Sequence, residues 1–273
     1  MKISASVADK PGAFSPFLFV GDLFEGMDRA VALGYDAVEL FVLDPREVGF
    51  ERIADGVMAR GLAVSAVGPG LASYRYGWLL TEPDAEKRRN CVERIMEGIR
   101  LAAHFRTSVN IGGSRGNLAE DPELRRRQRG WFLEATRQCA DFAGPLGVQL
   151  GIEPLNRYET NYINAVDEAL EFLAEVDRPN VGLLLDTFHM NVEEASLEAA
   201  VAKARGRLLN VHLVDSNRLA PGFGHTDLKS VVSQLRAIGY DRYLSMEILR
   251  LPSVEDAAAQ AVRHTRELLA TTQ

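Results

Sequence analysis

Eight short apolar segments, rich in β-branched residues, recur at fairly even spacing along the chain. They are KISASV (2–7), AVELFV (37–42), LAVSAVG (62–68), TSVNIG (107–112), GVQLGIE (147–153), VGLLLD (181–186), LLNVHLVD (208–215) and YLSMEIL (243–249). The segments between them carry apolar residues at three- and four-residue spacing, which predicts helices. Apolar strands that alternate with helices indicate a parallel sheet covered by helices. Eight such units in 273 residues predict one (β/α)8 TIM barrel of the α/β class, a single domain over residues 1–273.

A doubly wound open sheet is the alternative architecture. It usually carries a Gly-rich phosphate loop after its first strand, but this position reads SVADKPGAF, without G-x-G-x-x-G. We therefore favour the barrel. Three local expectations follow from the helix signals: Gly34 ends the helix in DLFEGMDRAVALG, Asn164 is the N-cap of VDEALEFLAEV, and GFGH (222–225) opens the seventh helix.

The charge balance excludes some classes of protein. The chain has 31 basic and 38 acidic residues, a formal charge of -7, and no basic block, which argues against a nucleic-acid partner. Cys91 and Cys139 lie far apart in helical patterns, so we expect buried free thiols in a reducing compartment. The apolar stretch in MKISASVADKPGAF is too short for a signal peptide, and the sequence has no 18-residue apolar run, so we expect a soluble cytoplasmic protein without a membrane partner.

Acidic and imidazole side chains collect at the ends of strands five to eight. Glu153 ends the fifth strand, Asp186 ends the sixth, His212 and Asp215 lie near the end of the seventh, and Glu247 lies in the eighth. Active sites of such barrels form at the C-terminal ends of the strands, and neighbouring strands lie about 4.8 Å apart. These side chains can therefore converge on one small volume.

Three carboxylates gathered in one place repel one another unless a cation binds there. Oxygen ligands with one imidazole suit Mn²⁺, Mg²⁺ or Co²⁺ better than structural Zn²⁺. A single Glu or Asp at a strand end is more often a solvated residue, and a single His is more often a core imidazole. Because these interpretations would have to hold on four adjacent strands at once, we favour a metal site formed by Glu153, Asp186, His212 and Glu247.

Four stretches carry a resemblance to a known family: IEPLNRYETNYINAVDEAL, LLLDTFHMNVEE, VHLVDSNRLAPGFGH and YLSMEIL. The chain resembles the sugar isomerases and epimerases of the xylose-isomerase-like barrel, and within them the D-tagatose 3-epimerase type. The resemblance implies that Glu153, Asp186, His212 and Glu247 bind one divalent ion, with Mn²⁺ expected first and Co²⁺ or Mg²⁺ as alternatives. It also implies a homodimer or homotetramer, and no further cofactor is indicated.

The same resemblance implies that Glu153 and Glu247 are the catalytic acid and base on opposite faces of the substrate. His189, Arg218 and Glu159 match positions that contact the sugar or hold the catalytic Glu in place. In this chemistry one Glu removes the C3 proton of a 2-ketose, a cis-enediolate forms, and the other Glu returns a proton to the opposite face. The substrate is then a keto-sugar such as D-tagatose or D-fructose, or a keto-sugar acid.

The choice between a neutral and an acidic substrate depends on Arg115. The fourth strand ends NIGGSRGN, so Arg115 is either a solvated charge or an inward guanidinium suited to a carboxylate. The GSRG turn and FVGDLFEGMDRAVALGYDAVEL are similar to 5-keto-L-gluconate (D-tagaturonate) epimerases. We therefore hypothesise that Arg115 meets a substrate carboxylate.

Other interpretations stay open at this point. The loop 68–80, with Tyr74, Arg75, Tyr76 and Trp78, is either a sugar-stacking or gating loop, or else a packed lid or a dimer contact. His225 is expected to be structural. Sugar or hydroxypyruvate isomerases, inosose-processing enzymes and dehydratases use similar barrels. Endonuclease IV-type enzymes need three zinc ions and more than the five His present here. A non-catalytic sugar-binding barrel is the alternative from another class.

Overall fold

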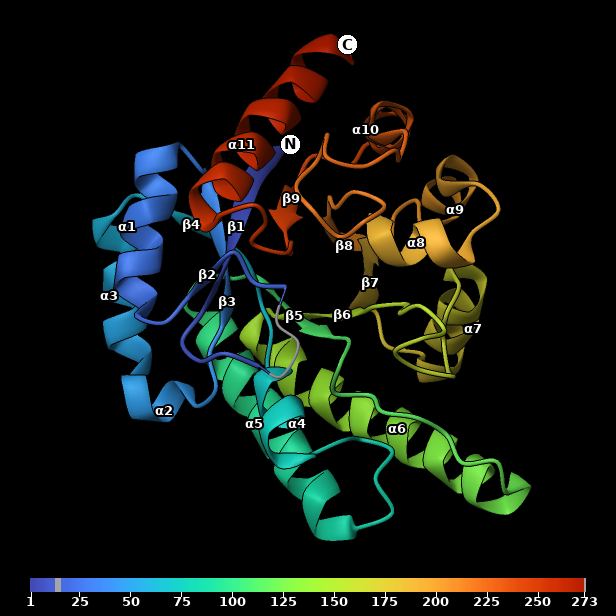
Figure 1. Ribbon diagram of the computed structural model, residues 1–273. Coiled ribbons are helices and arrows are strands. Elements are labelled where there is room, and N and C mark those ends of the chain that lie inside the picture. Colours follow the sequence, from blue (N-terminus) through green and yellow to red (C-terminus); the bar gives the residue numbers. More distant parts are fainter. Residues whose placement is uncertain (13–15, 273) are drawn as a thin grey trace.

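A computed structural model of the chain describes residues 1–12 and 16–272. The eight predicted strands form a parallel sheet that closes on itself (Figure 1). Their bounds are β1 Lys2–Ala8, β3 Ala37–Phe41, β4 Ala63–Val67, β5 Ser108–Ile111, β6 Gln149–Ile152, β7 Val181–Asp186, β8 Leu208–His212 and β9 Tyr243–Met246. Their order in the sheet follows the chain, and β9 pairs with β1, with Ile3 opposite Leu244. The predicted (β/α)8 barrel is confirmed.

A ninth strand, β2 (Phe19–Val20), extends the sheet beside β1 and was not predicted. Its two residues are too few to show a periodicity. Leu18, directly before β2, is held by Ser6, whose hydroxyl accepts from the Leu18 N–H at 2.8 Å and donates to the Met246 carbonyl at 2.6 Å.

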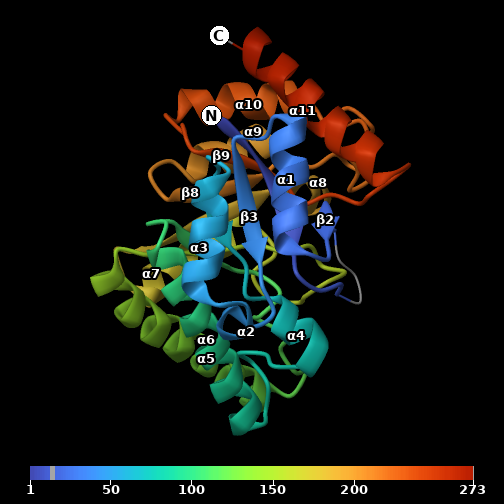
Figure 2. The ribbon, with the colours of Figure 1, turned by 90° about the vertical axis from the view of Figure 1, so that its left-hand side faces the viewer.

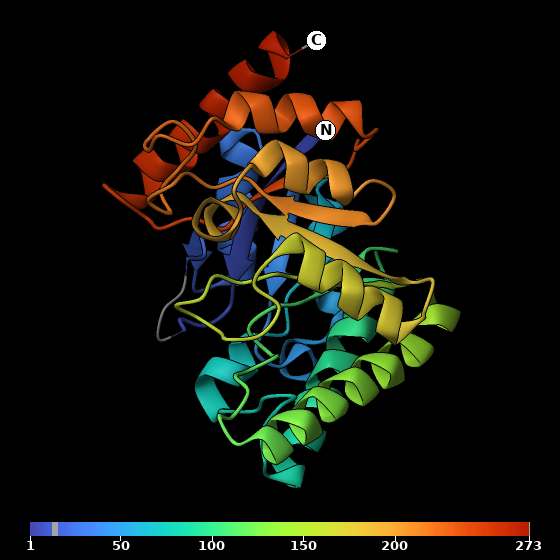
Figure 3. The ribbon, with the colours of Figure 1, turned by 90° about the vertical axis from the view of Figure 1, so that its right-hand side faces the viewer.

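Helices cover the outside of the barrel, as Figures 2 and 3 show from two opposite sides. Their bounds are α1 Leu23–Leu33, α2 Pro45–Val48, α3 Phe50–Ala59, α4 Leu71–Tyr76, α5 Ala85–Ala103, α6 Pro122–Ala143, the 3-10 helix η1 Gly144–Leu146, α7 Val166–Val176, α8 Thr187–Glu193, α9 Leu197–Lys203, α10 Leu228–Ala237 and α11 Val254–Thr271. The predicted end of α1 is confirmed, because Gly34 follows the helix with a left-handed φ of 82°. Among the described residues, no helix is long and apolar enough to cross a membrane.

Two expected helix starts were wrong. Ala165, not Asn164, is the N-cap of α7, and the Val166 N–H is satisfied by Glu194 at 2.7 Å. The Asn164 side chain instead donates to the Leu155 and Thr160 carbonyls and so holds the preceding loop. In the same way α10 begins at Leu228 rather than at GFGH (222–225), because Asp227 caps it through the Ser230 N–H.

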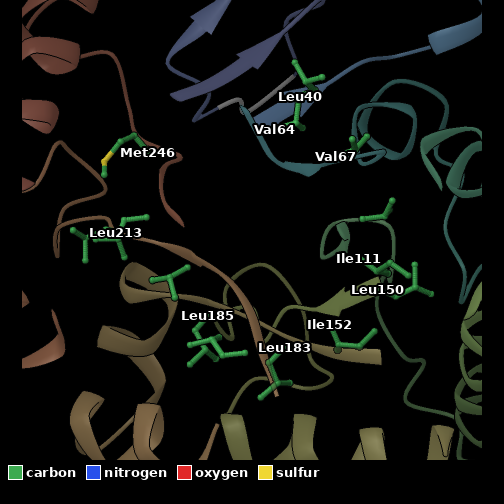
Figure 4. Packing of buried hydrophobic residues seen from close by; sticks show 14 of the residues in the cluster. Leu40, Val64, Val67, Ile111, Leu150, Ile152, Leu183, Leu185, Leu213 and Met246 are labelled. Carbon is green, nitrogen blue, oxygen red and sulfur yellow. The ribbon is translucent and has the colours of Figure 1, made fainter. Parts of the chain in front are cut away.

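The apolar core lies between the barrel and its helices. Figure 4 shows part of it, including Leu183 and Leu185 of β7, both of which are buried. Side chains alternate along a strand, so Leu183 and Leu185 lie on the face opposite to Asp186. Burial of each such side chain contributes about 1.5–3 kcal/mol. Cys91 and Cys139 belong to buried positions of α5 and α6 and are free thiols, as predicted.

The inside of the barrel is polar. The Ser65 hydroxyl of β4 lies 2.7 Å from that of Ser4 in β1 and 3.1 Å from that of Ser245 in β9. Neither β1 nor β9 is a neighbour of β4 in the sheet, so these contacts cross the interior of the barrel. All three serines are buried, and their hydroxyls satisfy one another there.

Candidate metal centre

Four side chains from four consecutive strands meet at the C-terminal end of the barrel. Glu153 directly follows β6, Asp186 and His212 end β7 and β8, and Glu247 directly follows β9. One oxygen or nitrogen of each lies within 4.8 Å of those of the other three. His212 Nδ1 lies 3.6 Å from Glu153 Oε1 and 3.5 Å from both Asp186 Oδ2 and Glu247 Oε2. The structure thus brings together the four residues that the sequence predicts as ligands.

Asp186 divides its carboxylate between two tasks. Its Oδ1 accepts from the Phe188 N–H at 2.7 Å and the His189 N–H at 3.3 Å, which caps the start of α8. Its Oδ2 is left to face the cluster. A buried strand can end on this carboxylate because one oxygen satisfies the helix and the other is available to a ligand.

Three atoms of the cluster are buried and lack a hydrogen-bond partner within the described residues: Glu153 Oε1, Asp186 Oδ2 and His212 Nδ1. A buried polar atom without a partner costs about 1–3 kcal/mol, and more when it is charged. A cation among these atoms would satisfy all of them at once. Carboxylate oxygens with one imidazole nitrogen form a donor set for a divalent ion such as Mn²⁺, Co²⁺ or Mg²⁺, so the residues present fit such an ion.

The electrostatics of Glu153 agree with this fit. Burial raises the pKa of Glu153 well above its ordinary value, and the carboxylates of Glu247 and Asp186 raise it further, although the charge of His212 opposes them. Protons and a divalent ion therefore compete for the same oxygens.

His189 borders the cluster as a neutral donor. Asn156 approaches its Nδ1 with both the backbone N–H, at 3.3 Å, and the side-chain amide, at 2.7 Å. An Nδ1 that accepts from Asn156 leaves the proton on Nε2. Nε2 lies 4.0 Å from both Glu153 Oε1 and Asp186 Oδ2 and has no hydrogen-bond partner in the described part of the chain. Burial lowers the pKa of His189, so this side chain can offer an uncharged N–H to a ligand in the cavity.

Arg218 links the other predicted contacts. Its guanidinium donates to Glu159 at 2.6 Å and to Glu247 at 3.4 Å, and it lies 5.0 Å from the centre of the Phe188 ring. The Arg218 backbone has a φ of 60°, which is uncommon for a residue with a side chain, and the Leu249 N–H donates to its carbonyl at 2.8 Å. The backbone of the loop after β8 is thus strained at Arg218, the residue whose guanidinium reaches the site.

Arg115 does not lie where the sequence analysis expected it. The side chain is fully buried, is not among the residues that line the cavity, and donates through Nη1 to the Glu153 carbonyl at 2.9 Å. The turn closed by the Arg115 N–H on the Gly112 carbonyl directs the side chain behind Glu153. This placement contradicts an inward guanidinium on the rim, and we do not retain Arg115 as a carboxylate contact.

Glu39 is a residue of the site that the sequence analysis missed. It lies in β3, is fully buried, and its carboxylate is 3.1 and 3.2 Å from His212 Nε2. It also accepts from the side-chain amides of Asn110 at 2.5 Å and Asn210 at 3.1 Å. Burial alone would raise the pKa of Glu39, but the charge of His212 and the hydrogen bonds from His212 and Asn210 lower it below its ordinary value. The one signal in the sequence was a Glu inside the otherwise apolar segment AVELFV.

A small cavity is lined by three of the four predicted ligands, Glu153, His212 and Glu247. It measures about 40 Å³, and its lining includes Phe17, Tyr74, Glu153 and His189. An outer pocket of about 660 Å³ adjoins it and shares Tyr74 and Arg218 with it. Tyr74 belongs to the short helix α4, in the loop that the sequence left open between a gate and a lid. Tyr74 is 45% exposed and lines both spaces, so it forms part of the boundary between the inner cavity and the outer pocket.

Two polar residues near the site serve the loop after β8. The Asp215 carboxylate accepts from the backbone N–H groups of Ser216, Gly222 and Thr226 at 2.8–3.1 Å. The His225 ring contacts the Ser216 hydroxyl at 2.9 Å. Neither side chain faces the four predicted ligands, and His225 has the structural position that the sequence predicted.

Comparison with known proteins agrees with this geometry. A family model described as "Xylose isomerase-like TIM barrel" matches residues 27–268. The L-ribulose 3-epimerase of Methylomonas sp. is 40% identical over 220 residues, which cover 80% of this chain and 75% of that protein. The 3-dehydro-D-guloside 4-epimerase of Escherichia coli is 35% identical over 114 residues, 42% of this chain and 44% of that protein. The crystal structure of a D-allulose 3-epimerase from Methylomonas sp. superimposes with a TM-score of 0.82 and 25% identity, over 98% of both chains.

Proposed function

Because the chain belongs to the xylose isomerase-like TIM-barrel family, we propose that it is a divalent-metal-dependent 3-epimerase of keto-sugars. The observation that carries the proposal is the convergence of Glu153, Asp186, His212 and Glu247 on one point, with buried atoms that lack other partners. Similar proteins, including the L-ribulose 3-epimerase of Methylomonas sp., act as 3-epimerases and support it.

These four residues would hold the ion. We propose Mn²⁺, with Co²⁺ or Mg²⁺ as alternatives, because three of the four ligands are carboxylates. When bound, the ion supplies the positive charge that makes the C3 proton of a ketose more acidic and stabilises the negative charge of the enediolate.

Glu153 and Glu247 are the proposed acid–base pair. One carboxylate removes the proton from C3, and the other delivers a proton to the opposite face of that carbon, which inverts its configuration. Their surroundings differ. Arg218 donates to the Glu247 carboxylate, whereas Glu153 Oε1 lies 4.0 Å from His189 Nε2 and has no hydrogen-bond partner in the described part of the chain. Such a difference suits a pair in which one member gives a proton and the other takes one.

His189, Arg218 and Glu159 are the proposed substrate and positioning residues. The Nε2–H of His189 is available to a sugar oxygen, since Nδ1 is occupied by Asn156. Arg218 donates to both Glu159 and Glu247, so we expect it to fix the direction of the Glu247 carboxylate.

We propose a neutral ketose rather than a keto-sugar acid as the substrate. Among the described residues that line the two spaces, Arg218 is the one arginine, there is no lysine, and its charge is already opposed by Glu159 and Glu247. A substrate carboxylate would add a negative charge to a cavity that already holds several.

The test follows hydrogen exchange. Protein loaded with Mn²⁺ in D₂O is incubated with L-ribulose, D-fructose, D-tagatose, D-tagaturonate or hydroxypyruvate, and the substrate is then examined by proton NMR after removal of the metal. We expect deuterium at C3 together with the C3 epimer, and loss of both in Glu153→Gln and Glu247→Gln. Exchange at C1 with an aldose or aldehyde product would reassign the protein to an isomerase. Metal binding without exchange of any substrate would favour a non-catalytic sugar-binding barrel.

We also propose that the enzyme is a cytoplasmic homodimer or homotetramer. Exposed aromatic side chains near the outer pocket, with Tyr158 84% exposed, are consistent with a covered surface in an assembly. Light scattering coupled to size-exclusion chromatography would measure the oligomeric state.

A further inference from the structure

Glu39 contacts polar side chains from two distant strands, one of which is the proposed ligand His212. Its carboxylate accepts hydrogen bonds from the side-chain amides of Asn110 in β5 and Asn210 in β8, and it contacts the Nε2 of His212 in β8. Neither β5 nor β8 is a neighbour of β3 in the sheet. Glu39 is fully buried from water, and it is one of the residues that line the inner cavity beside the cluster. A buried carboxylate is stable only where such donors surround it. These polar side chains therefore stabilise a negative charge on Glu39.

The position of this charge determines the proton on His212. An imidazole beside a carboxylate places its N–H toward that carboxylate, which here is on Nε2. When an ion is bound, Nδ1 then carries the lone pair, and it faces Glu153, Asp186 and Glu247 at 3.5–3.6 Å. Without Glu39 the neutral ring could carry its proton on Nδ1, where those three carboxylates would accept it and the lone pair would be turned away from the cluster.

We propose that Glu39 is a positioning residue of the metal centre, which fixes the Nε2–H tautomer and the orientation of His212 so that Nδ1 is a ligand. This inference rests on the proposed metal-dependent function. A carboxylate behind a ligand imidazole also raises the basicity of that ligand, and loss of such a partner typically weakens metal binding about 10- to 100-fold. Glu39 itself touches neither substrate nor ion in this role.

The chain offers matched variants for the test. Glu39→Gln keeps the size of the side chain and removes its charge, and Glu39→Asp restores the charge on a shorter side chain. Ser65→Ala is the control, because Ser65 belongs to the same buried polar interior but its hydroxyl contacts Ser4 and Ser245 rather than Glu39 or His212. Mn²⁺ affinity of each metal-free protein is measured by calorimetry, and the melting temperature without metal reports on the fold.

We expect Mn²⁺ to bind Glu39→Gln about 10- to 100-fold more weakly than wild type, with partial recovery in Glu39→Asp. Ser65→Ala should remain within about twofold, because its hydroxyl contacts neither Glu39 nor any of the four ligands. Equal Mn²⁺ affinity of folded Glu39→Gln and wild type would overturn the inference. Failure of the wild type itself to bind Mn²⁺, Co²⁺ or Mg²⁺ would instead overturn the proposed function.

A measurement on the wild type keeps the inference testable even if Glu39→Gln does not fold. Long-range ¹H–¹⁵N NMR spectra of the Mg²⁺-loaded protein distinguish a protonated from an unprotonated ring nitrogen. We expect the His212 proton on Nε2. A proton on Nδ1 in the metal-loaded protein would contradict the role assigned to Glu39.

Discussion

A single added methyl group at Gly112 should disable the metal centre without unfolding the barrel. Gly112 follows β5 directly and has no left-handed backbone that would itself require glycine. A Cβ at this position would lie 2.0 Å from Glu153 Oε2 and 3.1 Å from its carboxylate carbon. Gly112→Ala therefore acts through Glu153 and not through backbone strain.

The size of the effect follows from that distance. An ordinary contact begins near 3.4 Å, so the Glu153 oxygen must retreat by about 1.4 Å. Misplacement of a catalytic group by about 1 Å can cost 10²-fold in rate, which is about 2.7 kcal/mol. Glu153 borders the open cavity and can move, so we expect overpacking to destabilise the fold by no more than the usual 1–3 kcal/mol or so.

Gly113→Ala is the matched control, since its Cβ would meet the Tyr74 hydroxyl at 2.9 Å, at the end of a side chain that can turn aside. We expect kcat/KM for the preferred ketose to fall at least about 100-fold in Gly112→Ala, together with weaker Mn²⁺ binding, and Mn²⁺ affinity to stay near that of wild type in Gly113→Ala. Epimer formation is followed by chromatography, Mn²⁺ binding by calorimetry and folding by circular dichroism. Wild-type activity and metal affinity in Gly112→Ala would refute the assigned position of Glu153.

Three further predictions concern the whole protein. Chelation should lower the melting temperature by about 5–10 °C relative to protein with Mn²⁺ at 100 times its Kd, because binding then adds about 2.7 kcal/mol; an unchanged melting temperature would contradict a metal that binds the folded state. The buried Arg94 lies 2.7 Å from Asp44 and lowers the pKa of Asp44 well below its ordinary value. Asp44 therefore stabilises the fold above its unfolded pKa of about 3.9 and loses this contribution as the pH falls below that value. Asp44→Asn should cost about 1.5–3 kcal/mol in urea unfolding at pH 7, and its difference from wild type should shrink below about pH 4; a pH-independent difference would exclude the ionic contribution. Burial raises the pKa of both Cys91 and Cys139 to about 12, so neither thiol should react with a disulfide reagent at pH 8 until the protein is unfolded, and rapid labelling of folded protein would contradict their burial.

The strands and the four predicted ligands could be read from the sequence for the same physical reason. The strands are apolar on their outer face and carry mostly small or uncharged side chains such as Ser4 and Ser65 on their inner face, so a charged residue at the end of such a run is conspicuous. Parallel strands also bring their C-terminal ends to one edge. Glu153, Asp186, His212 and Glu247 satisfy both conditions, and their convergence needed no knowledge of loop conformation.

Residues outside those conditions were harder to predict. Glu39 lies inside a strand, where its direction depends on the register, and the pairing of β3 with β4 shifts between Val38 and Glu39. Simple alternation along the strand therefore does not establish which face Glu39 occupies. Arg115 lies beyond the end of β5, in a turn whose hydrogen bond from Arg115 to Gly112 decides its direction. Neither register nor turn direction is visible in composition or spacing.

The ligands and the residues that position them therefore differ in how well the sequence predicts them. The ligand positions follow from the barrel geometry, whereas Glu39 behind His212 and Arg218 beside Glu247 depend on a register shift and on a left-handed residue in a loop. Proteins that share the four ligands can therefore differ in these partners while they keep the same barrel and the same donor atoms. Because such partners set the tautomer of an imidazole and the direction of a carboxylate, they can change metal affinity and rate without changing a single ligand. In this chain, Glu39 and Arg218 are the positions at which that tuning should first be measured.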